Sequence, residues 1–193
     1  MIDLKGKKLV LASQSPRRQN LLKELGFDFE IKSADIDEVF PEHLEKEAIP
    51  MYLATEKAKA MMPGLMDDEI LITADTIVWL NGEAVNKPED RQDAFRMIKA
   101  MSGNEHVVYT GVQLTTKEKS LCFFAETSVY FSLLDEGEIN YYLDHYKPYD
   151  KAGAYGIQEW IGYIGIEKIE GSYFNVMGLP VHLLYQKIKD FIS

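Results

Sequence analysis

Residues 7–18 of the chain read Lys7-Lys8-Leu9-Val10-Leu11-Ala12-Ser13-Gln14-Ser15-Pro16-Arg17-Arg18, and they lead from a predicted strand into a predicted helix. The apolar run inside Lys7–Ala12 favours a short strand, and we expect the helix to cover Pro16–Leu25. Ser15 is a typical N-cap residue, proline is favoured at the first helical position, and Gly26 supplies the C-terminal stop. The stretch therefore forms one strand-to-helix unit of an α/β fold.

The beginning of this helix is a candidate anion site. Unpaired backbone N–H groups and the helix dipole favour a negative charge at a helix N-terminus. Arg17 and Arg18 lie in the first turn, where a positive charge opposes the dipole, and a bound polyphosphate would reverse that disadvantage. Guanidinium groups also match phosphate oxygens well. The alternative is an ordinary surface helix whose two arginines are solvated.

Strands and helices alternate along the rest of the chain. We expect strands over 27–33, 83–86, 106–115, 120–132 and 163–169, and helices over 46–61, 88–101, 135–142 and 179–191. We also expect a buried strand over 69–74 that ends on Asp75 and continues as 76–80. Asn81-Gly82 is a hairpin signal, and we expect the segment 148–160 to be a loop with a helical turn. Hairpins together with alternating helices predict a mixed α/β sheet.

The composition limits the classes of partner. The formal net charge is -10, which disfavours long polyanions such as nucleic acid polymers, and anionic membrane surfaces. A small phosphorylated ligand stays open, because local basic groups and a metal act at short range. Cys122 is the single cysteine, which excludes an intrachain disulfide and a multi-thiolate zinc site. Since the chain has neither an apolar signal segment nor a run of about 20 apolar residues, we expect a cytoplasmic location.

Two acidic residues are candidates for a metal site or a general base. Asp75 follows the apolar run Ile70-Leu71-Ile72-Thr73-Ala74, and we expect it at the end of a buried strand, where α/β sheets often place their sites. A carboxylate there can bind Mg²⁺ or deprotonate a water molecule. Glu38, in an acidic loop, is the second candidate. The alternatives are a turn or capping residue for Asp75 and a solvated loop charge for Glu38.

Lysines and a glycine-containing segment complete the candidate residues. Lys57 lies in a predicted helix, where a solvated face is the alternative, and Lys87 follows the predicted hairpin within reach of the same sheet edge as Asp75. The glycines of segment 150–158 permit close approach of a ligand, and Gln158 can read a base edge; the alternative is a flexible loop. The common phosphate-loop, dinucleotide, zinc-protease and serine-hydrolase motifs are absent. The residues alone therefore predict an α/β domain with a site for an anionic, metal-bound small molecule.

Taken together, these segments resemble the Maf family of nucleotide pyrophosphatases. The resemblance runs from Leu9 to about Leu184 and its elements come in the family's order. They are Ala12-Ser13-Gln14-Ser15-Pro16-Arg17-Arg18, Asp37-Glu38, Glu56-Lys57-Ala58, Ala74-Asp75-Thr76, Asn86-Lys87-Pro88, Ser102-Gly103, Thr110-Gly111-Val112, Asp150-Lys151-Ala152-Gly153-Ala154-Tyr155-Gly156-Ile157-Gln158 and Gly178-Leu179-Pro180. One such motif is unspecific, whereas the ordered set is specific.

The resemblance implies a single Maf-like domain over residues 1–193, with two α/β lobes around a cleft on a long, twisted mixed sheet, similar to the inosine-triphosphate pyrophosphatase architecture. It also implies hydrolysis of the α–β phosphoanhydride of a nucleoside triphosphate, with Mg²⁺ or Mn²⁺ as the cofactor. It suggests a homodimer. The chemistry is consistent with such a site, because transfer at phosphorus needs mainly positioning and charge stabilisation.

The resemblance assigns roles to individual residues. Asp75 would accept the proton of the attacking water, and Glu38 would hold the metal together with Asp75. The phosphates would be held and neutralised by Arg18, Lys57 and Lys87. Substrate binding and specificity would fall to Ser13, Arg17, Thr76 and Gln158.

Arg17, Thr76 and Gln158 together resemble the subgroup of the family that acts on dTTP and UTP, with modified pyrimidine nucleotides as further substrates. One departure is Glu159-Trp160, where the family more often has glycine, and this pair can reshape the base pocket. One alternative is the same reaction on 7-methyl-GTP or a deaminated purine triphosphate. Another is a nucleotide-binding regulator of septum formation that need not hydrolyse its ligand.

Overall fold

The computed structural model describes residues 2–33, 36 and 38–193. Its strands are β1 (Lys8–Leu11), β2 (Phe29–Ile31), β3 (Glu69–Leu80), β4 (Glu83–Val85), β5 (Glu105–Thr115), β6 (Ser120–Phe131) and β7 (Ile166–Gly171). Its α-helices are α1 (Pro16–Glu24), α2 (Ala48–Met61), α3 (Arg91–Met101), α4 (Glu136–Tyr146), α5 (Trp160–Gly165), α6 (Tyr173–Val176) and α7 (Val181–Phe191). Two 3₁₀ turns, η1 (Met62–Gly64) and η2 (Ala152–Ala154), complete the described elements.

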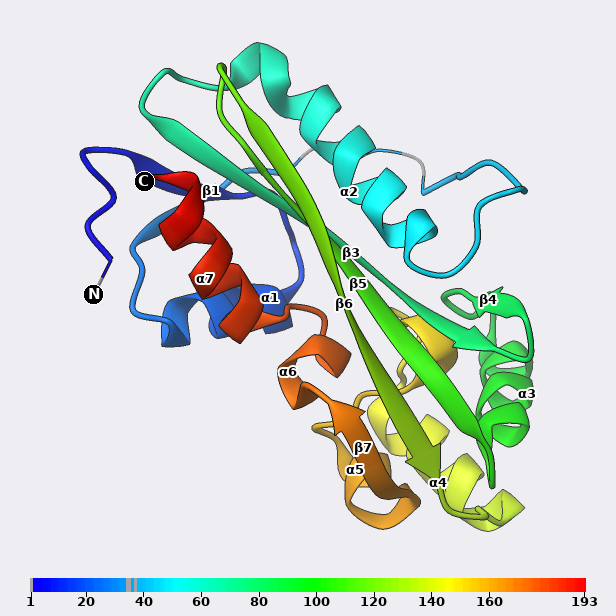
Figure 1. The fold of residues 1–193 in the computed structure, drawn as a ribbon. Coiled ribbons are helices and arrows are strands. Elements are labelled where there is room, and N and C mark those ends of the chain that lie inside the picture. Colours follow the sequence, from blue (N-terminus) through cyan, green and yellow to red (C-terminus); the bar gives the residue numbers. More distant parts are fainter. Residues whose placement is uncertain (1, 34–35, 37) are drawn as a thin grey trace. The chain divides into compact units, whose positions relative to one another are not determined.

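The described strands form one mixed sheet, which confirms the predicted fold class (Figure 1). Their order is β2-β1-β3-β5-β6-β7, and β4 pairs with β3 outside this path. Strand β1 runs parallel to both β2 and β3, whereas β3 with β4 and β6 with β7 are antiparallel pairs. The parallel pairs arise because a helical crossover separates the strands, and the β3–β4 pair arises from the Asn81-Gly82 turn.

The chain divides into two compact units, neither of which is continuous in sequence. The first contains residues 1–75, 110–125 and 178–193, and the second contains residues 76–109 and 126–177. Strands β3, β5 and β6 contribute residues to both units.

Each unit has an apolar core of its own. In the first, Val10 of β1 and Leu71 of β3 pack with Ala58 of α2. In the second, residues of α3 and α4 pack against β3, β5 and β6, with Ile98, Ile139 and Tyr142 fully buried. Burying a side chain of this size stabilises a fold by roughly 1.5–3 kcal/mol, so these clusters hold helices to strands.

Helix α1 follows the sequence expectation closely. It begins at Pro16 and ends before Gly26, whose φ of +80° is the left-handed conformation that glycine adopts without strain. Ser15 occupies the N-cap position but makes no side-chain capping bond. Instead, the Ser15 N–H donates to Oγ of Ser13 at 3.2 Å, so the cap expectation was right about the position and wrong about the hydroxyl.

The chain near residue 163 departs from the sequence expectation. A strand over 163–169 was predicted, but Tyr163 lies inside α5 and the strand begins only at Ile166. A backbone hydrogen bond of 2.9 Å from Gly162 N–H to the Glu159 carbonyl closes a helical turn here, and Gly165 packs on Leu134. Tertiary contacts therefore override the β-favouring pattern of this apolar segment.

Helix α6 was not expected at all. It is a single short turn, capped by the Ser172 side chain, which accepts a hydrogen bond from Asn175 N–H.

Within the described residues, no helix has the length and apolar character needed to cross a bilayer.

Candidate active site

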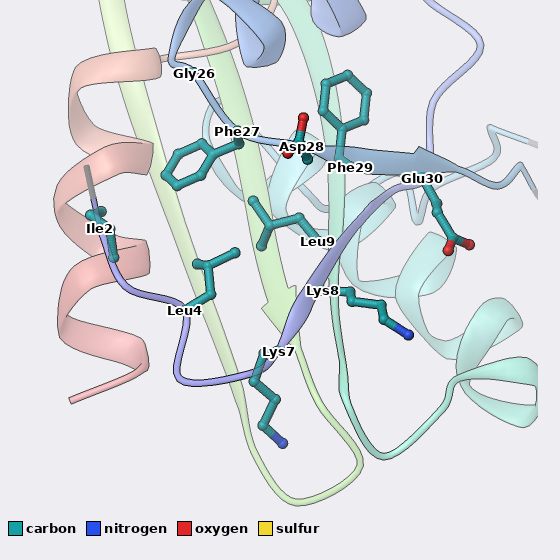
Figure 2. Close-up of a pocket in the computed structure, with 10 residues that line it drawn as sticks. All are labelled: Ile2, Leu4, Lys7, Lys8, Leu9, Gly26, Phe27, Asp28, Phe29 and Glu30. Carbon is teal, nitrogen blue, oxygen red and sulfur yellow. The ribbon is translucent and has the colours of Figure 1, made fainter.

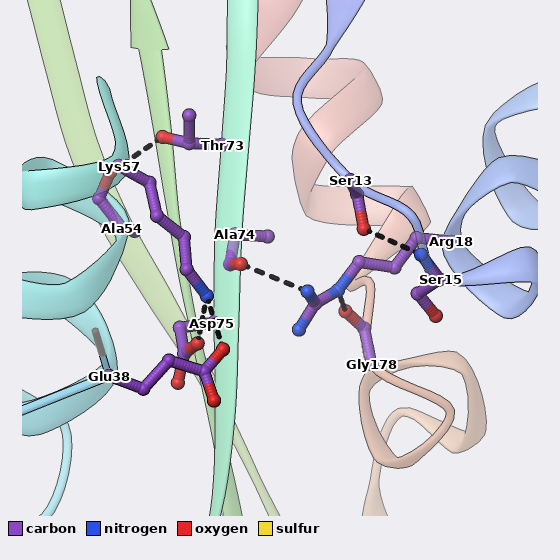
Figure 3. A network of polar contacts seen from close by, with 10 residues as sticks. All are labelled: Ser13, Ser15, Arg18, Glu38, Ala54, Lys57, Thr73, Ala74, Asp75 and Gly178. Carbon is purple, nitrogen blue, oxygen red and sulfur yellow. Dashed lines mark hydrogen bonds and ion pairs between the residues drawn. The ribbon is translucent and has the colours of Figure 1, made fainter. Parts of the chain in front are cut away.

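Arg18 is fixed by backbone carbonyls from two distant segments. Its Nε donates to the carbonyl of Gly178 at 2.7 Å, and its Nη1 donates to the carbonyl of Ala74 at 3.0 Å (Figure 3). The fork of the guanidinium suits two separate acceptors, which a lysine could not reach together. The first turn of α1 is thereby tied to β3 and to the segment that precedes α7.

Asp75 lies in the middle of β3, because the strand continues without a break to Leu80. The expectation that Asp75 ends a buried strand was therefore wrong. Residues 70–75 of β3 are all buried, since neighbours cover both faces of the strand, and the Asp75 side chain is only 9% exposed. A carboxylate at such a place must have a charged or hydrogen-bonding partner.

Lys57 supplies that partner from α2. Its Nζ lies 2.5 Å from Oδ1 of Asp75 and 2.9 Å from Oε1 of Glu38, so one cation bridges two carboxylates (Figure 3). The Lys57 side chain is 13% exposed and the Glu38 side chain 41% exposed. The structure thus brings both acidic candidates and one lysine candidate to the same point in the first unit.

Helix α2 is held against β3 and β5 by two close contacts. The buried hydroxyl of Thr73 donates to the carbonyl of Ala54 at 2.7 Å (Figure 3). On the other strand, a Cβ at Gly111 would lie 2.4 Å from the backbone nitrogen of Met51, so only glycine permits the observed approach of β5 to α2. These contacts fix the helix that presents Lys57.

Charges and burial act in opposite directions on Asp75. Burial raises the pKa of the Asp75 carboxyl above its ordinary value, and the positive charges of Lys57 and Arg18 offset part of that rise. Burial also lowers the pKa of Arg18, which Asp75 partly offsets. A buried acid with a raised pKa beside two cations is a candidate for a general base.

Ser13, Arg17 and Thr76 are predicted residues that neighbour Arg18 or Asp75 in the sequence. Ser13 is buried and positions the chain before α1, since its hydroxyl accepts from Ser15 and its carbonyl accepts from Gln19 at 3.0 Å. Arg17 is half-buried next to Arg18. Thr76 is half-buried on β3, directly after Asp75.

Three predicted residues, Thr76, Lys87 and Gln158, belong to the second unit. Lys87 is exposed in the segment between β4 and α3, and Gln158 is half-buried in the segment between η2 and α5. Their roles stay predictions. Asp37, the neighbour of Glu38 in the family motif, lies outside the described residues.

The acceptors of Arg18 were not found from the sequence. The carbonyls of Ala74 and Gly178 carry no side-chain signal, and backbone contacts of this kind leave no residue pattern. One local hint exists at Gly178, whose φ of +109° favours glycine.

The two carboxylates that contact Lys57, those of Glu38 and Asp75, are chemically suited to bind a divalent cation. Among the described residues, no group of three or more histidine, cysteine, aspartate or glutamate side chains is placed to hold a metal. Glu38 and Asp75, however, both direct a carboxylate oxygen to the same amino group. Hard cations prefer oxygen ligands and take further ones from substrate phosphates, so two carboxylates suffice as the protein's share.

A separate hollow of about 430 Å³ lies near the N-terminal residues of the first unit (Figure 2). Its apolar wall includes Leu4, Leu9 and Phe27, and Lys7 and Glu30 lie at its edge. None of the predicted site residues lines it.

The fold is a mixed α/β sheet, and the site has a buried acid between cations, beside a helix N-terminus that carries arginines. These features are typical of a protein that binds and processes an anionic small molecule. The chain belongs to the Maf family, described as Maf-like protein, whose family model matches residues 8–191. The resemblance noted in the sequence is thereby confirmed.

Relatives match the chain over almost its whole length. A Parabacteroides distasonis protein named dTTP/UTP pyrophosphatase is 55% identical over 190 residues, which cover 98% of each chain. A Bacteroides fragilis protein of the same name is 55% identical over 184 residues, or 95% of each chain. Among solved structures, the Staphylococcus aureus Ham1 protein has a TM-score of 0.46 and 15% identity over 65% of this chain and 72% of that chain.

Proposed function

We propose that this protein hydrolyses dTTP and UTP to the nucleoside monophosphate and pyrophosphate, with modified pyrimidine nucleotides as further substrates. The observation that carries the proposal is the buried Asp75 carboxylate held by Lys57, in a member of the Maf family. The two relatives described above, both named dTTP/UTP pyrophosphatase, support the choice of substrate.

In the proposed reaction, water attacks the α-phosphorus and the α–β phosphoanhydride bond breaks. Asp75 accepts a proton from the attacking water, and pyrophosphate leaves with the electron pair of the broken bond. The raised pKa of Asp75 suits the role of proton acceptor, because a stronger base removes a proton from water more readily.

Lys57 and Arg18 act on charge. Lys57 already pairs with two carboxylates, and with substrate present its amino group stabilises the negative charge that develops on the phosphate oxygens. Arg18 keeps its orientation through the two backbone carbonyls, so its guanidinium is fixed before a substrate binds. Lys87 contributes a further positive charge toward the phosphates.

Glu38 and Asp75 hold the proposed divalent cation, Mg²⁺ or Mn²⁺. When bound, such a cation supplies charge neutralisation at the phosphate oxygens. Specificity falls to Ser13, Arg17, Thr76 and Gln158. A cytoplasmic location and a homodimer are part of the same proposal.

The test is pyrophosphate release with Mg²⁺ from a panel of dTTP, UTP, CTP, 7-methyl-GTP, ITP and the common purine nucleoside triphosphates. We expect release mainly from dTTP and UTP. Turnover of 7-methyl-GTP or ITP instead would support the proposed reaction and contradict the proposed substrate. Binding without turnover of any nucleotide would favour a regulator of septum formation.

A further inference from the structure

A hydrogen-bond network in the second unit holds the segment that carries Gln158. The N–H of Gly156 donates to the Tyr142 hydroxyl at 3.0 Å, and that hydroxyl donates to Oε2 of Glu159. Burial raises the pKa of Tyr142, so the hydroxyl stays protonated and remains a donor. Lys151, which is only 9% exposed, places its amino group 3.1 Å from the other Glu159 oxygen. Both oxygens of the Glu159 carboxylate therefore have a partner.

The Gln158 side chain lies over Gly156, beside that carboxylate. A Cβ at position 156 would lie 3.0 Å from Nε2 of Gln158 and 3.0 Å from Oε2 of Glu159. The amide nitrogen and the carboxylate oxygen thus pack against the same point of the backbone. A side chain at position 156 would displace one or both of these groups.

The other end of the Gln158 amide has no partner. Its Oε1 atom is buried and accepts no hydrogen bond from any residue in the described part of the chain. Leaving a buried acceptor unsatisfied costs about as much as a lost hydrogen bond, so such a group is expected to meet a ligand or a water molecule.

Electrostatics decides which end of the amide faces away from Glu159. A negative carboxylate attracts the N–H donors of the amide and repels its carbonyl oxygen, so the nitrogen end stays beside Glu159. Tyr142 and Lys151 hold the carboxylate in place, and thereby hold this preference in place. The end of the Gln158 amide that lies away from Glu159 is consequently an acceptor, and not a donor.

Uracil and thymine carry one hydrogen-bond donor on their base-pairing edge, the N3–H group. Cytosine has a lone pair at N3 and carries its donor on the neighbouring 4-amino group, so an acceptor placed at N3 distinguishes the two. We propose that Glu159, held by Tyr142 and Lys151, is a positioning residue that turns the Gln158 oxygen toward N3–H and so selects uracil and thymine against cytosine. This inference rests on the proposed function, because it takes the pyrimidine triphosphates as the substrate class.

The experiment is a double-mutant cycle on substrate choice. The ratio of kcat/KM for UTP to that for CTP is measured in the wild type, Glu159→Gln, Gln158→Leu and the double variant. A glutamine at 159 fills the same volume and can keep a hydrogen bond to Tyr142. It carries no negative charge, so it no longer favours the nitrogen end of the Gln158 amide over the oxygen end. We expect Glu159→Gln to lower the ratio about tenfold in the Gln158 background and less than about twofold in the Gln158→Leu background.

Tyr142→Phe is the second variant, and it removes the hydroxyl that Glu159 accepts from; we expect it to lower the UTP-to-CTP ratio in the same direction. Asp144→Asn on the same helix is the matched control, because Asp144 is exposed and pairs with Arg91, and the ratio should not change. If turnover is too slow to measure, equilibrium binding of UMP and CMP by calorimetry gives the same ratio.

A loss of the ratio that is equal in both backgrounds, or no loss in either, would overturn the positioning role while the proposed function stands. A wild type that hydrolyses UTP and CTP equally would do the same. A wild type that neither binds nor hydrolyses any pyrimidine nucleotide would overturn the proposed function, and this inference with it.

Discussion

The amino group of Lys57 lies 2.5 Å from Oδ1 of Asp75, on a carboxylate that β3 buries almost completely. Because the same amino group also contacts Glu38, the lysine lies between two negative charges and reduces their repulsion. The arrangement gives Asp75 a charged partner without removing its raised pKa.

Replacing Asp75 by asparagine should abolish the reaction and keep the fold. The substitution conserves the shape of the side chain and removes the proton acceptor, so we expect kcat on dTTP to fall by about 10²–10⁴-fold. Circular dichroism and the melting temperature check the fold. Asp67→Asn is the control, because Asp67 pairs with Lys117 on the surface and should leave kcat unchanged. Retained activity in Asp75→Asn would remove Asp75 from the role of base.

The rate should depend on pH through Asp75. The reaction needs the ionised carboxylate, so kcat/KM falls as the pH falls through the pKa of Asp75, and burial places this fall above the ordinary aspartate value of about 4. Lys57 lowers this pKa, so Lys57→Met should raise it and move the fall to still higher pH, beside a lower maximal rate. Lys59→Met, an exposed lysine of the same helix, should leave the profile in place. A profile that moves to lower pH in Lys57→Met would contradict the assignment.

Glu38 should govern the requirement for the metal. Glu38→Gln removes one of the two carboxylates proposed to hold the cation, so the Mg²⁺ concentration that gives half-maximal activity should rise by roughly 10–100-fold. The measurement is a Mg²⁺ titration at saturating dTTP. Glu42→Gln, an exposed residue of the same loop, is the control. An unchanged titration in Glu38→Gln would show that Glu38 is not a metal ligand.

Gly111→Ala should displace α2. Its new Cβ would lie 2.4 Å from the Met51 backbone nitrogen, so strand or helix must move, at a cost of about 1–3 kcal/mol. We expect a Tm lower by roughly 2–12 °C and a reduced kcat, because Lys57 moves with its helix. Gly64→Ala is the matched control, since no atom lies within 4 Å of a Cβ built there. Equal melting temperatures for the two variants would contradict the close approach.

Local signals predicted much of the fold. The strand and helix over 7–26, the Asn81-Gly82 hairpin and helix α7 follow from apolar spacing, turn residues and helix stops, which act within a few residues. Tyr163 shows the limit of such signals. Its segment has a strand pattern, yet a turn bond at Gly162 and packing on Leu134 make it a helix.

The site was predicted in its residue types more than in its contacts. The Lys57–Asp75–Glu38 bridge joins residues that are 18 and 19 positions apart, and no local rule predicts a lysine between two acids. The buried Gln158 oxygen is a stronger case. The sequence indicates an amide that can donate or accept, and only the neighbouring Glu159 carboxylate decides between the two.

Arg18 and Gly178 are separated by 160 positions along the chain, and their hydrogen bond gives the arginine one of its two fixed acceptors. During synthesis at about 5–20 residues per second, roughly 10–30 s pass between the appearance of the first partner and that of the second. From the addition of residue 75 onward, the nascent chain contains Lys57 and Asp75 but still lacks the Gly178 carbonyl to which Arg18 donates. On the ribosome, the proposed site is therefore completed among the last steps, after both units have nearly all of their sequence.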